Sequence, residues 1–172
     1  MTAKANPWLA APSPKTELPR EQLQARIEQL LATQNMCVVA TIGRSGPVAS
    51  PVEYYNHGTT IYFVSNPGAP KLKNLERDGR ISVAIFQPFV GWPSARGCQI
   101  FGTAEILRSG TAAYDEGMQV YGWQKGATDL GLPLDRSPQI PLIKLAPDRI
   151  VYTEHYLRKE GYAPRQVWRR ED

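Results

Sequence analysis

The fold is decided by the stretch SPVEYYNHGTTIYFVSN (residues 50–66), followed by PKLKNLERDGRISVAIF (70–86) and GCQIFGTAEIL (97–107). Its pattern predicts two strands joined in a hairpin, a short helix that carries Lys71 and Lys73, and two further strands. A strand that ends at Ser65 and leads into a lysine-bearing helix is suited to hold a phosphate, because the N–H groups at a helix start lack partners within the helix. The stretch therefore predicts a β-rich fold with a phosphate-binding site at a strand-to-helix junction.

The residues before this stretch predict one amphipathic helix and the first strands. Pro19 begins a helix whose apolar residues recur at the spacing of one helical face, namely Leu23, Ile27, Leu30 and Leu31. Residues 37–42 form a β-branched run that predicts a buried strand, and residues 43–46 form a hairpin turn with glycine at both ends. The next strand, 48–56, contains Pro51. Because proline cannot donate to a strand ladder, we expect a sheet edge or a bulge there.

The remaining elements predict that the chain closes into a small barrel. A helix is expected over residues 111–121, followed by a glycine- and proline-rich segment up to residue 138, and strands at 140–145 and 149–153 complete the sheet. Six or seven short strands joined mostly by tight turns are typical of a mainly β, closed antiparallel barrel. We assign residues 20–157 to this barrel domain, residues 1–19 to a mobile N-terminal arm and residues 158–172 to a basic C-terminal tail.

Composition places the chain among ordinary globular proteins. It has 172 residues, of which 42% are apolar and 21% charged, so one domain with a real core is expected. No apolar run approaches the length of a membrane span, the N-terminus lacks the apolar core of a secretory signal, and a cytoplasmic location is expected. Cys37 and Cys98 each lie in an apolar strand pattern, which favours reduced core thiols over a disulfide or a zinc site.

The sequence contains no self-sufficient catalytic motif. Its two histidines, His57 and His155, lie in a hairpin turn and after the last strand, and neither belongs to an H-E-x-x-H metal motif. There is no G-x-S-x-G element to present a serine nucleophile, and Glu53 and Glu105 are isolated carboxylates rather than an acid–base pair. We therefore expect no catalytic side chain and no metal, and a bound cofactor would have to supply the chemistry.

The lysine-bearing helix and one tryptophan are the candidate binding features. Lys71 and Lys73 lie about 200° apart around a helix axis, so only one of them can face a given point, and Lys71 is closer to the helix start. On its spacing alone, the segment KLKNLERDG is more typical of an amphipathic surface helix with ordinary charges than of a phosphate site. Trp92 lies in a loop between two strands, where it would stack on a planar ring, contact a partner subunit, or anchor the loop on its own barrel.

The order of the elements and the sequence of residues 50–107 resemble those of the FMN-binding split-barrel proteins related to pyridoxamine 5'-phosphate oxidase. The similarity extends from about Leu30 to Tyr152. The resemblance implies a six-stranded antiparallel Greek-key split barrel, a homodimer, and a flavin cleft at the dimer interface. It implies that backbone groups of the second strand border the flavin ring, at Ser50, Pro51, Val52, Glu53 and Tyr54. It places the cofactor phosphate at the end of the third strand and on the basic helix, at Val64, Ser65, Asn66, Lys71 and Lys73.

Several positions depart from the oxidase pattern. Pro70 stands where the oxidase has an arginine before the lysine matched by Lys71, and Ala49 replaces the arginine that begins the flavin-bordering strand. A flavin-bordering tryptophan aligns with Thr153, and the arginine–histidine substrate signature has no match near the C-terminus. The resemblance therefore implies a relative of the oxidase rather than the vitamin B6 oxidase itself, with FMN as the cofactor and a deazaflavin, haem or no cofactor as alternatives.

These observations lead to one main functional expectation and two alternatives. We expect an FMN-dependent oxidoreductase that passes hydride or electrons to a small molecule, with NADH or NADPH as a possible donor and Trp92 at the cofactor. The first alternative is a non-catalytic flavin- or haem-binding protein, or a deazaflavin-dependent reductase. The second is a nucleic-acid-binding barrel, suggested by a net charge of +4 and a pI of about 9.1. It is disfavoured because the basic and aromatic residues do not interleave on any strand pair.

Overall fold

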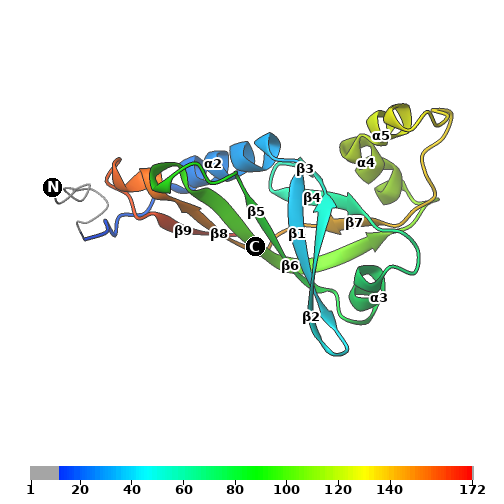
Figure 1. Cartoon of the computed structure of the whole chain (residues 1–172), viewed down its shortest axis with the longest axis horizontal. Coiled ribbons are helices and arrows are strands. Elements are labelled where there is room, and N and C mark those ends of the chain that lie inside the picture. Colours follow the sequence, from blue (N-terminus) through cyan, green and yellow to red (C-terminus); the bar gives the residue numbers. More distant parts are fainter. Residues whose placement is uncertain (1–11, 172) are drawn as a thin grey trace.

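The computed structural model describes residues 12–171 and contains one curled antiparallel sheet with helices on one face and at one end (Figure 1). The strands are β1 (Met36–Gly43), β2 (Gly46–Glu53), β3 (Tyr55–His57), β4 (Thr60–Val64), β5 (Arg80–Phe86), β6 (Arg96–Leu107), β7 (Leu142–Leu145), β8 (Arg149–Glu154) and β9 (Arg165–Arg169). The helices are α2 (Arg20–Thr33), α3 (Pro70–Arg77), α4 (Ala112–Tyr121) and α5 (Trp123–Asp129), with short 3-10 turns η1 (Trp92–Ser94) and η2 (His155–Arg158).

Strand β6 joins the two halves of the sheet. Its first half pairs with β5 and β8, and its second half pairs with β7, so that the path β2-β1-β5-β6-β7-β4-β3 carries β8 and β9 as a side branch. The change of partner occurs at Gly102, where a Cβ atom would lie 2.8 Å from the Leu145 side chain. A Cβ there would also lie 3.0 Å from the Ala146 carbonyl oxygen, so the lack of a side chain at Gly102 lets the following loop pack closely where the strand changes partner. The result is the mainly β split barrel that the sequence predicts.

Helix α2 covers the inner face of the sheet and closes the main core. Its predicted apolar stripe is confirmed, because Leu23, Ile27, Leu30 and Leu31 are all buried. Cys37 and Cys98 lie in the same core and are free thiols, as predicted. The predicted turn at residues 43–46 is confirmed by the pairing of Gly43 with Gly46 at the end of the β1–β2 hairpin.

The predicted strand 48–56 is two strands in the structure. Strand β2 runs through Pro51 without a bulge and pairs only with β1, so Pro51 lies on an edge strand. The chain then leaves β1 at Tyr54, whose side chain is buried and whose hydroxyl donates to the Leu31 carbonyl over 2.8 Å. Beyond it, β3 pairs with β4 in the other half of the sheet. The anchoring of Tyr54 in the core accounts for the break.

The C-terminal residues add a strand that the sequence did not indicate. Part of the segment assigned to a basic tail, Arg165–Arg169, forms β9, which pairs with β8. Gln166 and Trp168 of this strand point inward, and Arg165, Val167 and Arg169 are exposed. Because two of the three exposed residues are arginines, the segment resembles a solvated tail rather than an alternating strand. The described end of the N-terminal arm packs here too, because Leu18 is buried and its N–H donates to Gln166 over 3.1 Å. Residues 1–11 of that arm lie outside the described residues.

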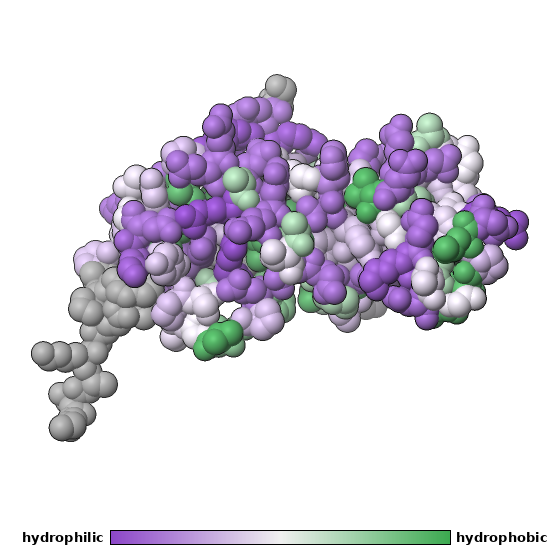
Figure 2. Space-filling model, turned by 90° about the horizontal axis from the view of Figure 1, so that it is seen from above, coloured by the Kyte–Doolittle hydropathy of each residue, from purple (hydrophilic) through white to green (hydrophobic). Residues whose placement is uncertain are grey.

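Helices α4 and α5 form a separate pair at the end of the sheet beside β7 (Figure 1). Helix α4 corresponds to the predicted helix 111–121, and Tyr114 and Met118 on it pack with Tyr62 and Leu142 in a second, smaller core. Helix α5 was not predicted, because its segment is rich in glycine and proline. Figure 2 shows a largely hydrophilic surface with hydrophobic patches at this end. Within residues 12–171, no helix is long and apolar enough to cross a membrane.

Candidate functional site

The junction between β4 and α3 leaves a buried hydroxyl without a partner. Ser65, the first residue after β4, is only 2% exposed, and its N–H donates to the Pro141 carbonyl over 3.1 Å. Its Oγ atom is buried and has no hydrogen-bond partner among the described residues. An orphaned buried hydroxyl is costly, so it points to a group that the protein binds there.

The start of α3 supplies further donors at the same junction. A turn closed by a 3.1 Å bond from the Ala69 N–H to the Asn66 carbonyl leads into the helix, which begins with Pro70. No side-chain cap bond to this helix occurs among the described residues, so the N–H groups of its first turn lack a partner there. Lys71 is half-buried and forms no ion pair with any residue in 12–171. With Ser65, these groups give a hydroxyl, helix N–H groups and an ammonium, the donor set that a phosphate requires.

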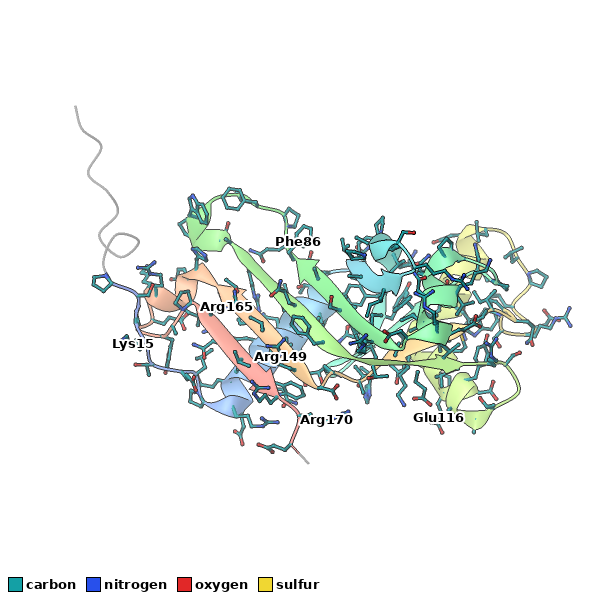
Figure 3. All side chains as sticks on the ribbon, turned by 90° about the horizontal axis from the view of Figure 1, so that it is seen from below. Lys15, Phe86, Glu116, Arg149, Arg165 and Arg170 are labelled. Atoms are coloured by element: carbon teal, nitrogen blue, oxygen red, sulfur yellow. The ribbon has the colours of Figure 1, made fainter. Side chains whose placement is uncertain are left out.

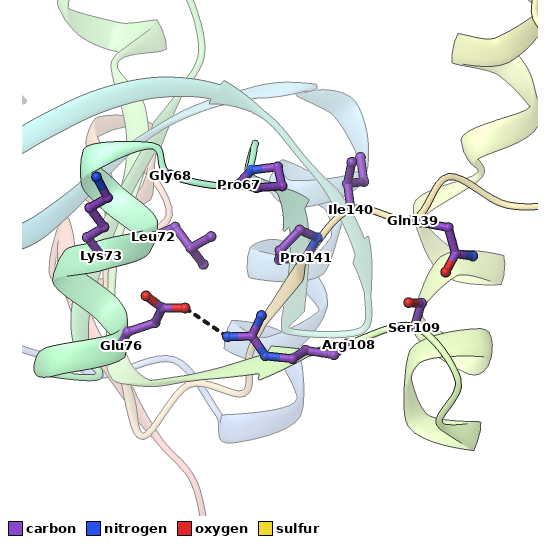
Figure 4. A pocket seen from close by; sticks show the side chains of 10 residues that line it. All are labelled: Pro67, Gly68, Leu72, Lys73, Glu76, Arg108, Ser109, Gln139, Ile140 and Pro141. Carbon is purple, nitrogen blue, oxygen red and sulfur yellow. Dashed lines mark hydrogen bonds and ion pairs between the residues drawn. The ribbon is translucent and has the colours of Figure 1, made fainter.

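The structure separates Lys73 from Lys71, as their spacing predicts. Lys73 is exposed and lines both of the cavities that flank α3, whereas Lys71 lines neither. The first cavity, of about 330 Å³, lies between α3, the end of β6 and residues 139–141. It is crossed by an ion pair of 2.7 Å between Glu76 and Arg108 (Figure 4). The second lies between α3 and the β1–β2 hairpin.

Strand β2 presents an open edge and a small, rigid outer face. On the outer face lie Pro47, Ala49, Pro51 and Glu53, all exposed, while Ser50 and Val52 point to the other side and are half-buried. Because β2 pairs only with β1, backbone groups on its other edge are free of strand pairing. Tyr54 is different, since its N–H donates to the Asn35 carbonyl over 3.0 Å. Of the five residues expected to border the flavin ring, Tyr54 thus has no free N–H, and Pro51 has no backbone N–H at all.

A cluster that the sequence analysis missed lies at the end of β2. The Tyr55 hydroxyl donates to Glu53 Oε1 over 3.1 Å, and its ring meets that of Tyr121 on α4 edge-on, with 5.0 Å between centroids. Burial, with the nearby Glu53 carboxylate as a smaller cause, raises the pKa of Tyr121 to about 12. Glu53 and Tyr55 are two apart along the chain, but nothing in the sequence brings α4 to them.

Trp92 lies far from the junction within its own chain. It is 61% exposed in η1, and its ring contacts those of Phe89 and His155 at 5.7 and 5.3 Å between centroids. Strand β5 separates α3 from this loop, and its seven residues span roughly 20 Å. Within this chain Trp92 therefore packs against Phe89 of its own loop and His155 of η2, away from the β4–α3 junction.

No helix in the described part of the chain covers the face of the sheet opposite α2. Small and apolar side chains of β1 and β5 form its centre, among them Val38, Ala40, Ser82 and Ala84. In Figure 3, Phe86, Arg149 and Arg165 come from β5, β8 and β9 on this side, and the Arg149 guanidinium stacks over the Phe101 ring at 4.2 Å. A shallow cavity of about 300 Å³ on this face is lined by residues that include Phe86, Gly97, Thr153 and Arg165.

The family model described as pyridoxamine 5'-phosphate oxidase matches residues 23–154, which is more than half of the chain. The chain belongs to the pyridoxamine 5'-phosphate oxidase family. The matched region of this chain includes the β4–α3 junction, strand β2 and Trp92. A search of curated protein sequences found no match.

Solved structures share the fold of this family member at low sequence identity. A candidate pyridoxamine 5'-phosphate oxidase from Listeria innocua is 22% identical with a TM-score of 0.61, over 76% of this chain and 97% of that one. A heme-binding protein from Mycobacterium smegmatis is 21% identical with a TM-score of 0.64, over 90% of this chain and 60% of that one. An FAD-binding protein from Mesorhizobium loti is 15% identical with a TM-score of 0.59, over 73% of this chain and 90% of that one.

The described side chains of this family member offer little chemistry of their own. No group of three or more His, Cys, Asp or Glu residues within 12–171 could hold a metal ion. Burial raises the pKa of both Cys37 and Cys98 to about 12, so neither thiol is an activated nucleophile. What the arrangement offers instead is the hydroxyl of Ser65, the first N–H groups of α3 and the ammonium of Lys71.

Proposed function

We propose that the chain is an FMN-binding oxidoreductase of the pyridoxamine 5'-phosphate oxidase family, which carries hydride or electrons to a small molecule. The observation that carries the proposal is the buried, unpartnered Oγ of Ser65 at an uncapped helix start beside Lys71. These groups would hold the cofactor phosphate, together with the backbone of Val64 and Asn66. Lys73 lies on the other side of the helix, so we assign the phosphate to Lys71.

Each part of the chain has a separate task in this function. The open edge of β2, from Ser50 to Glu53, would orient the flavin ring through backbone groups. On its outer face, Ala49 and Pro51 project little, which leaves room for a planar ring system. The Glu53–Tyr55 hydrogen bond at the end of β2 holds a carboxylate and a phenol where a substrate would approach. Bound FMN supplies two-electron redox chemistry, which the described side chains lack.

The active form is proposed to be a homodimer with the flavin cleft at its interface. The uncovered sheet face supports this, because apolar and small residues such as Val38 and Ala84 lie at its centre. A partner seated on this face would bring its own Trp92 loop or β9 toward the first chain's cofactor site. Trp92 is thereby assigned to the cofactor of the partner. NADH or NADPH is the proposed electron donor and the cytoplasm the proposed location, consistent with two free thiols.

A non-catalytic flavin- or haem-binding role is the second candidate. It is favoured by the structural similarity to the Mycobacterium smegmatis heme-binding protein and the Mesorhizobium loti FAD-binding protein. The two candidates share the cleft and differ in turnover, so they are separated by whether NADH or NADPH bleaches the bound flavin and air restores it.

The test of the proposed function is a visible absorption spectrum of the purified chain before and after incubation with FMN and desalting. Retained flavin bands, with a mass that corresponds to a dimer, support the proposal. A Soret band in the purified chain would instead support the haem-binding candidate. A colourless chain that rejects FMN would overturn the assignment of the cofactor.

A further inference from the structure

A groove between the β1–β2 hairpin and α3 is not explained by the flavin site. It has a volume of about 700 Å³, which lies in the range of small-molecule sites. Residues 43–48 of the hairpin form one wall. The other wall is the face of α3 that carries Pro70, Lys73, Asn74 and Arg77.

The groove has positive charge that no lining carboxylate neutralises. Arg44, Lys73 and Arg77 line it, and its described lining includes no Asp or Glu. Neither Arg44 nor Lys73 forms an ion pair with a residue in 12–171, and both are exposed. One nitrogen of Arg77 donates to the Ile42 carbonyl, which leaves further N–H groups of that guanidinium available.

The carboxylates nearest in sequence are engaged elsewhere. Glu76 pairs with Arg108 at 2.7 Å on the opposite flank of α3. Asp78 pairs with Arg80 at 2.6 Å, and this arginine, with Arg77 as a smaller cause, lowers the pKa of Asp78 to about 2. Three cations therefore face one hollow, an arrangement suited to an anion that carries more than one negative charge.

The two walls are fixed to one another before any ligand arrives. Asn74 is 7% exposed and donates from Nδ2 to Thr41 Oγ1 over 3.0 Å, which joins α3 to β1. At the hairpin end, a Cβ on Gly43 would lie 2.7 Å from the Gly46 carbonyl oxygen, so only glycine permits this tight turn. The cations thus extend from a rigid frame, which reduces the entropy cost of binding.

The groove begins where the proposed phosphate site ends. Pro70 lines the groove, and Lys71, the next residue, belongs to the phosphate site at the start of the same helix. Because Lys71 and Lys73 point to different sides of α3, two phosphate groups can be held around one helix.

We propose that this groove binds the diphosphate of a nicotinamide dinucleotide that acts as electron donor, beside the first phosphate site. The inference rests on the proposed flavin function. The two phosphates of FAD share one bridging oxygen, so a single FAD cannot place one phosphate at Lys71 and the other at Lys73 on the opposite side of α3. Arg44 and Lys73 contact the phosphate oxygens of the donor, and the FMN phosphate stays with Ser65 and Lys71.

The first experiment titrates ADP into the purified full-length chain by calorimetry, with adenosine as the uncharged comparison. We expect ADP to bind and adenosine to bind at least tenfold more weakly. Arg44→Ser and Lys73→Ser should each weaken ADP binding by roughly tenfold, the effect of one lost charge-assisted hydrogen bond. Arg136→Ser is the matched control, because Arg136 is exposed and lies outside the groove. Absence of ADP binding, or equal binding by all variants, would overturn the proposal.

The second experiment separates this inference from the flavin function. Equal FAD and FMN affinities, with NADH or NADPH binding weakened in Arg44→Ser, assign the groove to the donor. A higher affinity for FAD than for FMN that is lost in Arg44→Ser would place the cofactor's own diphosphate in the groove and overturn the inference. If Arg44→Ser weakens FMN as much as FAD, the groove holds the first phosphate and the inference is wrong. If FMN binding is weakened by substitution of Lys71 but not by Arg44→Ser, the proposed flavin function stands whatever the outcome for the groove.

Discussion

Asn74 and Thr41, 33 residues apart, form a buried side-chain hydrogen bond of 3.0 Å from Nδ2 to Oγ1. It joins the middle of α3 to β1, and both residues are almost fully buried. The bond fixes the helix that carries Lys71 on one side and Lys73 on the other. The position of the proposed phosphate site and that of the cationic groove therefore depend on the same pair.

Asn74→Ala is expected to lower the free energy of unfolding by about 1–3 kcal/mol, because Thr41 is left without its partner in the core. Adding Thr41→Val removes the orphaned hydroxyl, so the double variant should lose less than the sum of the two single changes. Urea unfolding followed by circular dichroism measures all three values. Strict additivity would show that the two side chains do not interact.

Ser65→Ala is expected to separate stability from cofactor binding. Its Oγ is buried without a partner, so its removal should leave the melting temperature unchanged or raise it. FMN affinity should fall by about 1–3 kcal/mol, since a hydrogen bond to a charged phosphate is lost. Thermal melting and quenching of flavin fluorescence give the two quantities. A variant that binds FMN as well as the unmodified chain would place the phosphate elsewhere.

Lys71→Ala is expected to weaken FMN binding by roughly 1–3 kcal/mol, the scale of a charge-assisted hydrogen bond to phosphate. Lys15→Ala is the matched control, because Lys15 is exposed and lies before α2. The loss should shrink as salt is added, since the contribution is electrostatic. An unchanged dissociation constant in Lys71→Ala would remove this lysine from the site.

The local pattern of the chain predicted most of the fold. The apolar stripe of α2, the hairpin turn at residues 43–46 and the edge position of Pro51 each follow from spacing or from the chemistry of one residue. Strand β9 was missed because its outward arginines resemble a solvated tail. Helix α5 was missed because glycine and proline around it suppress the helical signal, although Ala127 on it is buried.

The candidate site was predictable only where it is local. The Ser65-to-Lys71 junction is continuous in sequence, so its donors could be recognised together. The Tyr55–Tyr121 contact and the groove that joins Arg44 to Lys73 and Arg77 bring distant segments together. Such contacts depend on how the sheet curls and on which helix covers it, and no periodicity within one segment encodes them.

Ala84→Glu is expected to dissociate the proposed homodimer. Ala84 lies on the uncovered sheet face, paired with Val38 on β1 and Gln99 on β6, and its side chain points away from the core. A charge there would be buried without a partner in the dimer but solvated in a monomer. Analytical ultracentrifugation should show the monomer mass with an unchanged circular dichroism spectrum. Ala25→Glu, on the exposed face of α2, is the control and should remain dimeric.

Cys37 and Cys98 are expected to resist thiol reagents in the folded chain and to limit its stability at alkaline pH. Burial raises the pKa of each thiol from 9.0 to about 12, so at pH 8 roughly one molecule in ten thousand carries a given thiolate. Labelling with a disulfide reagent should therefore be slow until urea unfolds the chain, when two thiols react.

The same shift sets the direction of the pH dependence. Since the folded state holds the thiols protonated above their unfolded pKa, the stabilisation is fully present below pH 9 and is lost as pH rises toward 12. Tyr121 acts in the same direction from pH 10, because its pKa is raised to about 12. Urea midpoints between pH 7 and 11 should be level at first and then fall, and Cys37→Ala should reduce the slope of that fall. Rapid labelling of the native chain at pH 8, or a midpoint that rises above pH 9, would contradict the burial of these thiols.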